Sequence, residues 1–399
     1  MNVFLALDVG TTNWKAVLFT AEGTIVDRRS VPTVTHRDDH GSYYDPNEMW
    51  SSVYSTVRTL VDANGQAEIA AIAVTSIAES GVAIGGDGEP VCNSIAWFDP
   101  RSTPQAQRIE SQIGRERLFA ITGLDPNPIF SLFKLEWMRE HDPDAFNAME
   151  KWVWIADYVN YRLTGEIATD YSLASRTMLL DIHSGSWSKE ILSALNLPES
   201  LLPELVPSGS RLGSVTRRAS EQTGIPEGVP VIVGGHDHHC AFLAAGALGR
   251  ELTLDSSGTV ESIMKLLPKG AEAPTESRDL RVGYFVDPNR YATMAGVLGA
   301  GVSVDWAMRT IWKGAESGEE ITTDEYNAAM GAVDALQPKP DNPFYLPHIR
   351  GAGAPYWDAT SRGAFVGIRP NHSRAVLMRS VIEGLCFELR VLLSAVDRA

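Results

Sequence analysis

The chain has 399 residues, more than a single hydrophobic core usually covers, so we expect at least two domains. Its 44% hydrophobic and 21% charged residues are typical of an ordinary globular protein. The formal net charge of −16 argues against nucleic acid or an acidic membrane surface as a partner, because phosphate backbones are bound by clustered Lys and Arg.

The cysteines and the N-terminus indicate the cellular compartment. Cys92, Cys240 and Cys386 are widely spaced and form neither a disulfide framework nor a CxxC metal site, which fits a reducing environment. The first residues, MNVFLALDVG, lack a basic region and predict a buried strand rather than a signal peptide. No apolar run reaches the ~18 residues that a membrane span needs. We expect a cytoplasmic protein without a membrane partner, and we leave a homodimer open.

Short β-favouring runs begin the chain. Val3 to Val9, Lys15 to Thr20 and Thr24 to Val31 are separated by the turns GTTN and AEG. Three consecutive strands predict a meander, which is not how the βαβ unit of a Rossmann fold begins. A helix is expected from Pro46 to Val61, where apolar residues recur at helical spacing, and a strand from Ile69 to Ser76.

The middle of the chain is predicted to be largely helical. The segment VAIGGDGEPV predicts a hairpin and NSIAWFD a strand, and helical patterns then extend from Gln105 to Arg162 with a break at GLDPNP. Leu195 to Ser214 is rich in Pro, Ser and Gly and is expected to wrap over the surface. Val229 to Gly235 predicts a buried strand, and CAFLAAGAL a helix of small residues.

A second series of strands repeats the architecture of the first. It comprises ELTLDSSGT, VESIMKLL and RVGYFV, and the chain ends in a helix from Arg374 to about Val396. In both DVGTTN and LDSSGT, a strand leads through Asp into a turn of small residues. This repeat predicts a domain boundary near residues 246–252, which gives domains 1–248 and 249–399. We therefore expect an α/β protein of two domains, each a mixed sheet flanked by helices, with a central cleft.

Both turns are candidate phosphate-binding sites, because Gly, Thr and Ser present backbone N–H groups and hydroxyls in one concave spot. Gly10 and Gly258 allow close approach of the backbone. Asp8 would hold Mg²⁺, directly or through water, since a carboxylate repels phosphate. Lys15 adds positive charge unless it points to solvent, and either turn alone has the alternative of being a simple hairpin. The residues assigned to phosphate are Gly10, Thr11, Thr12, Asn13, Lys15, Ser257, Gly258 and Thr259.

Other nucleotide-binding motifs are absent from the sequence. There is no GxxxxGK[ST], so the protein is not of the P-loop type. The run GVLGAG, from Gly296 to Gly301, has the order GxxGxG and is better explained by close helix packing than by a dinucleotide site.

Several segments resemble the FGGY family of carbohydrate kinases, which belongs to the actin-like ATPase superfamily. LDVGTTNWKAVLFTAEGTIV is similar to the first phosphate motif of this family, and LDSSGT to the second. PVIVGGHDHHCAFLAAGAL resembles the segment with the catalytic aspartate, and LPHIRGAGAPYWDATSRGAFVGI is close to a family signature. KLEWM and DYVNYRLTGE extend the likeness over the whole chain. The resemblance implies two ribonuclease H-like domains and the phosphorylation of a small sugar or polyol by ATP with Mg²⁺.

Asp237 is the candidate catalytic base. It follows a buried strand at a Gly-Gly turn, where a side chain can project into a cleft. Phosphoryl transfer needs a carboxylate that orients the hydroxyl and accepts its proton, and the resemblance assigns this role and a substrate contact to Asp237. The alternatives are a helix N-cap, or a zinc site with His236, His238 and His239.

Glu79 and Trp97 are the candidate sugar contacts. A carboxylate binds hydroxyls, and an aromatic face covers the C–H groups of a polyol. The resemblance favours Glu79 and Trp97 for these roles, and core packing is the alternative for Trp97. Asp99 and Arg101, in IAWFDPRS, are further candidates, with a structural ion pair as their alternative.

Departures from the family bear on the substrate. Glycerol kinases carry Arg before the pocket Glu and Tyr before the Phe-Ser pair, where this chain has Ala78 and Ile129. Xylulose kinases have Met-His where this chain has Glu79 and Ser80. Glycerol and xylulose are therefore not favoured, and we expect another ketose, pentose, pentitol or similar substrate.

The C-terminal end suggests an alternative function. Members of the family continue beyond the final helix into a Gly-Gly-containing adenosine-binding segment, to which nothing in this sequence corresponds. The alternative is therefore a truncated kinase, or a catalytically impaired sugar-binding or regulatory protein. An actin-like or chaperone ATPase is disfavoured by GAPYW together with Glu79 and Trp97.

Overall fold

The computed structural model describes residues 2–249, 251–258, 260–273, 279–314, 320–337, 339–358 and 360–398. The chain divides into two compact units. The first comprises the described parts of Met1–Gly249, Pro268–Glu276 and Val282–Tyr291. The second comprises those of Arg250–Leu267, Ser277–Arg281 and Ala292–Ala399. The domain boundary between residues 248 and 249 stays a prediction.

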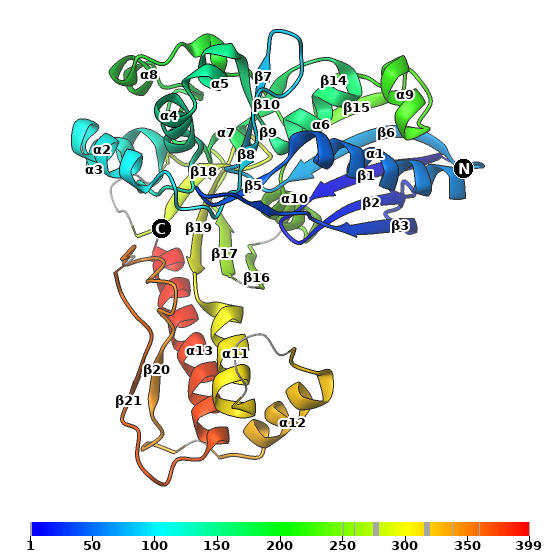
Figure 1. The fold of residues 1–399 in the computed structure, drawn as a ribbon. Helices are drawn as coiled ribbons and strands as arrows, with labels where there is room; N and C mark the ends of the chain where they lie inside the picture. The colour runs from blue at the N-terminus through cyan, green and yellow to red at the C-terminus, as the bar shows by residue number, and fades with distance from the viewer. Residues whose placement is uncertain are drawn as a thin grey trace. The chain divides into compact units, whose positions relative to one another are not determined.

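A six-stranded mixed sheet forms the centre of the first unit (Figure 1). Its strands are β1 (Asn2–Val9), β2 (Asn13–Phe19), β3 (Ile25–Pro32), β6 (Glu68–Ser76), β14 (Arg211–Ser214) and β15 (Pro230–His236). They lie in the order β14-β15-β6-β1-β2-β3. β15, β6 and β1 are parallel, whereas β14, β2 and β3 run antiparallel to their neighbours. The predicted meander is confirmed, because β1, β2 and β3 pair in succession.

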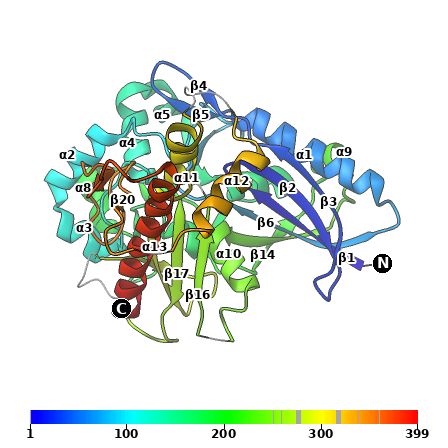
Figure 2. The same ribbon diagram turned by 90° about the horizontal axis from the view of Figure 1, so that it is seen from below.

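Helix α1 (Pro46–Ala63) packs along β2 and β3, as Figure 2 shows. The Asp45 side chain caps it by accepting hydrogen bonds from the backbone N–H groups of Asn47 and Glu48. The apolar residues of its inner face, Met49, Trp50, Val53, Val57 and Leu60, are buried. The predicted helix is confirmed with nearly the expected bounds.

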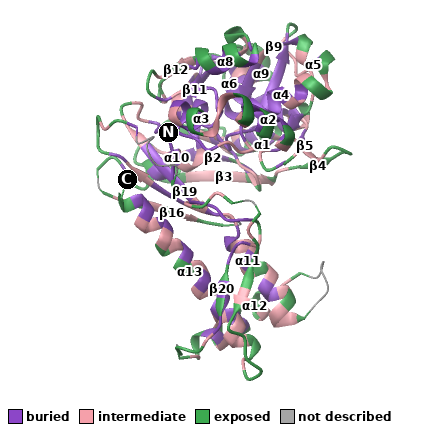
Figure 3. Cartoon of the chain, turned by 90° about the vertical axis from the view of Figure 1, so that its left-hand side faces the viewer, coloured by how far each residue is buried: buried purple, intermediate pink, exposed green. Residues whose placement is uncertain are grey.

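Further helices surround this sheet. They are α2 (Thr103–Ile113), α3 (Arg115–Thr122), α4 (Ser131–His141), α5 (Pro143–Ala148), α6 (Ile155–Thr164), α7 (Tyr171–Ala174), α8 (Lys189–Leu195), α9 (Arg217–Thr223) and α10 (Asp237–Ala244), with a 3₁₀ turn at Glu199–Leu201. α6 and α10 both contact β6 and β15, and α10 lies on the side of the sheet opposite α1 (Figure 1). Figure 3 shows buried residues in the interior of this unit, whereas β3 has only intermediate and exposed residues and α8 carries exposed residues.

Short strands complete the first unit. They are β4 (His36–Arg37), β5 (Ser42–Tyr44), β7 (Gly81–Gly85), β8 (Ser94–Ile95), β9 (Met149–Trp154), β10 (Ala168–Asp170), β11 (Leu180–Asp181), β12 (Ser186–Trp187) and β13 (Glu204–Val206), together with most of β18 (Arg281–Tyr284). Two predictions are corrected here. β9 interrupts the stretch expected to be helical, because MEKWVW pairs with the buried strand β7. The stretch expected to wrap over the surface contributes β14 to the main sheet.

The second unit contains an antiparallel sheet and a long C-terminal helix. Its elements are β16 (Thr253–Ser257), β17 (Glu261–Leu266), β19 (Tyr291–Val297), α11 (Ala300–Ala307), a π-helical turn (Met308–Lys313), α12 (Thr323–Asp334), β20 (Phe344–Leu346), β21 (Ala364–Val366) and α13 (Arg374–Arg398). β16, β17 and β19 pair in that order, and α13 contacts α11, α12 and β20. The segment RVGYFV, expected as the third strand of this series, contains β18, and β19 lies between β17 and β18 in the sheet.

The run GVLGAG connects β19 to α11 and packs tightly through its glycines. A Cβ at Gly299 would overlap the carbonyl oxygen of Pro347, and one at Gly353 would overlap that of Gly296. These glycines therefore allow close packing, as expected, and the segments that approach them are backbone around Pro347 and Gly353. Among the residues that the structure describes, no helix is both long and apolar enough to cross a bilayer.

Candidate active site

Three carboxylates lie at or just beyond the ends of three neighbouring parallel strands of the first unit. Asp8 lies near the end of β1, Glu79 shortly after β6, and Asp237 directly after β15. In the register of the sheet, Asp8 is paired with Thr75 of β6, and Gly235 of β15 is paired with the same threonine. The carboxyl ends of the three strands therefore meet at one edge of the sheet, which is where open α/β sheets commonly bind their ligands.

Asp237 is the first residue of α10, and His236 occupies the N-cap position. The alternative that Asp237 is the N-cap of this helix is therefore wrong, because the N-cap is the preceding residue. Its Oδ1 accepts a hydrogen bond from the backbone N–H of His238 at 2.6 Å, and the side chain remains 24% exposed. Burial, assisted by the negative charges of Asp8 and Glu79, raises the pKa of Asp237 to about 6. The carboxylate is thus ionised at neutral pH and more basic than an ordinary aspartate.

Two of the histidines beside Asp237, His236 and His239, are held neutral. His236 and His239 are both buried, and burial lowers the pKa of His239 to about 3 and that of His236 well below its usual value. The His239 ring stacks on Phe285 with 5.5 Å between ring centroids. Within the described residues, no group of three or more His, Cys, Asp or Glu side chains is arranged to hold a metal ion, so the zinc alternative finds no geometric support.

Glu79 is buried and paired with Arg176, a residue that sequence reasoning did not single out. The Nε and Nη2 atoms of Arg176 donate to Glu79 Oε1 at 2.8 and 2.6 Å. Both side chains are 8% exposed, and the guanidinium carbon of Arg176 lies 5.3 Å from the centroid of the Phe130 ring. Because both hydrogen bonds end on Oε1, the Oε2 atom takes neither of them.

Trp97 connects the pocket to the first turn. Its indole Nε1 donates to Thr11 Oγ1 at 2.9 Å, and its side chain is half-buried. The turn itself is closed by a hydrogen bond from Gly10 N to the Asn13 carbonyl at 3.2 Å, and the Thr33 hydroxyl donates to the Gly10 carbonyl. The side chain of Thr12 is exposed. The turn therefore has a fixed backbone and faces a residue of the candidate sugar pocket.

Lys15 forms an ion pair with Asp8 instead of extending freely into solvent. Its Nζ lies 3.0 Å from Asp8 Oδ2, and the two side chains are 49% and 32% exposed. The other carboxylate oxygen, Oδ1, faces Gly10 of the turn. Asp8 Oδ1 could therefore be one ligand of a Mg²⁺ ion whose other ligands include phosphate oxygens.

The second turn lies in the second unit. Ser257 ends β16, and its hydroxyl lies 3.4 Å from Asp255 Oδ1 and 3.4 Å from Glu261 Oε1. The Gly258 carbonyl accepts a hydrogen bond from Gly301 N at 3.1 Å, which joins this turn to the start of α11. Thr259, the remaining residue assigned to this turn, lies outside the described residues.

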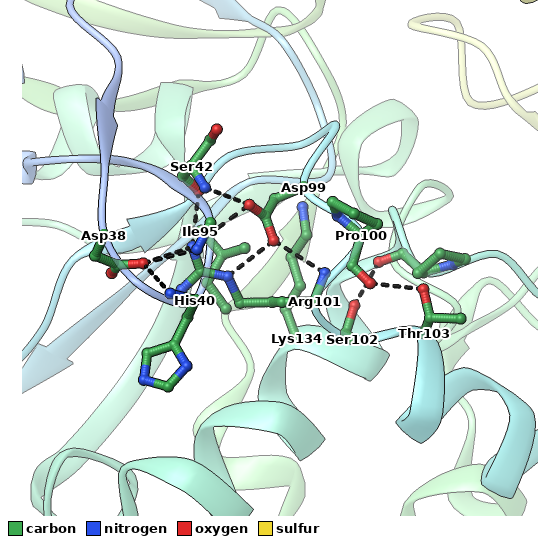
Figure 4. A network of polar contacts seen from close by, with 12 residues as sticks. Asp38, His40, Ser42, Ile95, Asp99, Pro100, Arg101, Ser102, Thr103 and Lys134 are labelled. Atoms are coloured by element: carbon green, nitrogen blue, oxygen red, sulfur yellow. Dashed lines mark hydrogen bonds and ion pairs between the residues drawn. The ribbon is translucent and has the colours of Figure 1, made fainter. Parts of the chain in front are cut away.

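Asp99 and Arg101 form a structural ion pair in a buried polar network, which Figure 4 shows. Asp99 is 1% exposed and accepts hydrogen bonds from the backbone N–H of Ser42 and from Arg101 N and Nε, the latter two at 2.9 and 2.8 Å. Arg101 also donates to the Ser42 carbonyl and lies 5.0 Å from the centroid of the Trp137 ring. Gly41 has φ of 145°, and a Cβ there would overlap Asp99. The pair anchors the loop before β5, so the structural alternative explains both residues.

Substitution of Asp99 tests this structural role. We expect Asp99→Asn to lower the free energy of unfolding by about 3 kcal/mol, because the buried Arg101 would lose its nearest carboxylate and keep only Asp38 at 3.6 Å. The KM for sugar should change little, because Asp99 is not assigned to the sugar. Urea unfolding and steady-state kinetics measure both. The control is Asp341→Asn, which removes the partner of Arg369 from an exposed pair and should cost less than about 1 kcal/mol. A stable Asp99→Asn variant with a greatly raised sugar KM would contradict the assignment.

Lys134 is a second residue near the pocket that sequence reasoning missed. It lies on α4, is 0% exposed, and donates from Nζ to the Glu79 carbonyl at 3.0 Å and to the Trp97 carbonyl at 3.4 Å. Burial lowers the pKa of Lys134 to about 7, although the charges of Glu79 and Asp99 oppose this shift. The signal in the sequence was a lysine among the apolar residues of SLFKLEWM.

A cavity of about 470 Å³ lies elsewhere in the first unit. Its walls include Asp38, His40, Arg101, Trp137 and His141. Asp8, Glu79, Trp97 and Asp237 are not among the residues that line it. We therefore take the edge of the main sheet, and not this cavity, as the candidate active site.

Comparison with known proteins identifies the family. Residues 3–244 match the model of the N-terminal domain of the FGGY family of carbohydrate kinases, and residues 254–399 match that of its C-terminal domain. The chain belongs to the FGGY family of carbohydrate kinases. It is therefore a carbohydrate kinase, and the resemblance inferred from its motifs is confirmed.

Individual FGGY kinases match over nearly the whole chain. A xylulose kinase of Lactococcus lactis subsp. lactis is 30% identical over 394 residues, which are 98% of this chain and 76% of the relative. The L-fuculokinase of Escherichia coli K12 is 29% identical over 399 residues, 97% of this chain and 79% of the relative. The structure of a xylulose kinase from Rhodospirillum rubrum superposes with a TM-score of 0.89 at 25% identity, covering 99% of this chain and 79% of that one.

Family membership bears on the other expectations. The α/β fold of two domains with mixed sheets flanked by helices is confirmed by its structural neighbours among FGGY kinases. The family supports phosphorylation of a sugar by ATP. Because xylulose kinases are among the relatives, the departure at Glu79 and Ser80 does not by itself exclude xylulose. The substrate and the roles of individual residues are therefore matters for proposal.

Proposed function

We propose that this FGGY kinase transfers the γ-phosphoryl group of ATP to a hydroxyl of a neutral small sugar or polyol, with Asp237 as the base. The observation that supports the proposal best is the position of Asp237 at the end of β15, beside the strand ends that precede Glu79 and contain Asp8. A carboxylate of raised pKa at this edge is suited to accept a proton at neutral pH.

The proposed reaction uses Asp237 to orient one substrate hydroxyl. As the oxygen of that hydroxyl forms its bond to the γ-phosphorus, the bond from phosphorus to the β-phosphate oxygen breaks and ADP leaves. The proton of the hydroxyl passes to the Asp237 carboxylate. We assign sugar binding to Glu79, whose Oε2 is outside the Arg176 pair, and to Trp97, whose ring would cover C–H groups of the substrate.

Phosphate binding is proposed separately for each turn. In the first unit we assign it to the turn of Gly10, Thr11, Thr12 and Asn13, with Lys15 beside it. In the second unit we assign it to the turn of Ser257, Gly258 and Thr259. Mg²⁺ would be held by Asp8, directly or through water, and would neutralise phosphate charge during transfer.

A neutral substrate is favoured by the charges near Glu79. The Arg176 guanidinium already pairs with Glu79, and Lys134 donates to two backbone carbonyls. His236 and His239 are neutral because they are buried. A sugar acid would therefore bring its carboxylate towards Asp237 and Glu79 without meeting a free cation in this part of the described site.

An ADP-release assay over a substrate panel tests the proposal. The panel contains D-xylulose, L-fuculose, other ketoses, pentitols and glycerol as neutral substrates, and D-gluconate as a sugar acid. We expect the highest kcat/KM for a neutral ketose or polyol. Turnover of gluconate above every neutral compound would refute the neutral-substrate assignment. Absence of turnover on the whole panel, with sugar binding retained in calorimetry, would refute the proposed activity.

A further inference from the structure

Lys134 is a fully buried lysine whose hydrogen bonds end on backbone oxygens of the two candidate sugar contacts. Its Nζ donates to the Glu79 carbonyl at 3.0 Å and to the Trp97 carbonyl at 3.4 Å. Burying a charged group costs several kcal/mol unless hydrogen bonds compensate, so an apolar side chain would be the less costly choice for stability alone. A lysine at this buried position therefore requires an explanation beyond core packing.

The backbone of Glu79 has an unfavourable conformation that needs support. Its φ is 64°, and the backbone N–H of Ser80 donates to the Ala78 carbonyl at 2.8 Å, which closes a tight turn over three residues. A turn of this type with positive φ is rare, and a non-glycine residue in it costs roughly 1–3 kcal/mol. Such a conformation persists only where the surrounding structure holds it.

The support comes from one face of α4. Ser131 and Lys134, three residues apart, both donate to the Glu79 carbonyl, at 3.2 and 3.0 Å. The Ser131 hydroxyl is itself fixed, because it accepts a hydrogen bond from Trp154 Nε1 at 2.8 Å. These two hydrogen bonds hold the Glu79 carbonyl towards α4, and the Glu79 carboxylate accepts hydrogen bonds from Arg176.

Lys134 also reaches the segment that follows β8. The Trp97 carbonyl accepts its hydrogen bond, and the Trp97 indole donates to Thr11 of the first turn. One ammonium group therefore connects the loop after β6 with the loop after β8. Those two loops bear the two side chains that we assign to the sugar.

We propose that Lys134 is a positioning residue that sets the spacing between Glu79 and Trp97 and thereby determines the affinity for the sugar. The inference rests on the proposed function, since it uses the assignment of these two residues to the sugar. Both bonded carbonyls belong to sugar contacts, and neither belongs to Asp237 or to a phosphate turn. Loss of Lys134 should therefore raise the KM for sugar far more than the KM for ATP.

The test is the variant Lys134→Met, which keeps an unbranched side chain one atom shorter than lysine and removes its donors. We expect the KM for sugar to rise about 10- to 100-fold, since misplacement of binding groups by about 1 Å has effects of this size. The KM for ATP should change less than about 3-fold. The melting temperature should stay close to that of the unchanged protein, because removing a buried charge offsets the lost hydrogen bonds.

Two further variants keep the inference testable if Lys134→Met does not fold. Lys134→Gln retains N–H donors on a neutral side chain one atom shorter and should give an intermediate sugar KM. Ser131→Ala removes the other donor to the same carbonyl and should raise the sugar KM by a smaller factor. A well-folded Lys134→Met or Lys134→Gln variant with an unchanged sugar KM would overturn the inference. So would a parallel rise of both KM values with a lowered melting temperature, which indicates a structural role only.

Failure of the inference can be told apart from failure of the proposed function. Glu79→Gln and Trp97→Phe are measured alongside in the same assay. If both leave the sugar KM unchanged, the assignment of the sugar site is wrong, and the inference about Lys134 fails with it. If both raise the sugar KM and Lys134→Met does not, only the positioning role of Lys134 is refuted.

Discussion

Replacing Asp237 by Asn is expected to lower kcat by about 10²- to 10⁴-fold while sugar binding persists. The amide keeps the shape of the carboxylate and its position at the start of α10, but it cannot accept the proton of the attacking hydroxyl. ADP release under saturating sugar and ATP measures kcat, and calorimetry measures sugar binding. The control is Asp397→Asn, at a carboxylate on α13 that is 68% exposed and paired with Lys265, which should leave kcat within about 2-fold.

The pH dependence of the same reaction provides a second measure of the base. Since the pKa of Asp237 is raised to about 6, its carboxylate is ionised above this pH and protonated below it. We expect kcat/KM to be constant near neutrality and to fall as the pH decreases through about 6. The residual activity of Asp237→Asn should lack this decrease. An Asp237→Asn variant with undiminished kcat would show that another group accepts the proton.

Breaking the buried pair of Glu79 and Arg176 is expected to have the second largest effect. We expect Arg176→Met to lower the free energy of unfolding by about 3–5 kcal/mol, because it leaves the Glu79 carboxylate buried without its partner. It should also lower kcat/KM for sugar by about 10²-fold, because the carboxylate loses its fixed orientation. Denaturant unfolding and steady-state kinetics give the two quantities.

A double-mutant cycle separates these contributions. Glu79→Gln combined with Arg176→Met removes both charges, so its loss of unfolding free energy should be smaller than that of Arg176→Met alone. Sugar binding should stay poor in the double variant. Arg217→Met, at an exposed pair with Glu221, serves as the control and should cost no more than about 0.5 kcal/mol. Additive losses in the cycle would mean that Glu79 and Arg176 do not act as a pair.

Much of the fold follows from local patterns in the sequence. The first strand alternates, with Val3, Leu5, Leu7 and Val9 buried, and this period of two predicts a strand with one buried side. β9 shows where such reasoning fails. Met149–Trp154 lies among helices, and its residues Trp152, Val153 and Trp154 are all buried, so no alternation distinguishes it from a buried helix.

The sequence predicted those residues of the candidate site that lie at the ends of strands. Asp8, Glu79 and Asp237 each lie at the end of an apolar run or shortly after it, which is a local signal. Arg176 was missed because it reaches Glu79 across 97 positions of the chain, and Lys134 because it reaches the same residue across 55. Such pairings depend on the arrangement of α4 and α7 around the sheet, and no local pattern predicts them.

The hydrogen bond from Trp97 to Thr11 has a consequence for stereochemical selectivity. The indole N–H is the only hydrogen-bond donor of a tryptophan side chain, and here it is directed to the Thr11 hydroxyl. If the sugar lies against Trp97 as proposed, the ring can offer it only an apolar surface. Epimers that present an unbroken row of C–H groups to this surface would then bind, whereas inversion at one carbon would press a hydroxyl against the ring and be rejected.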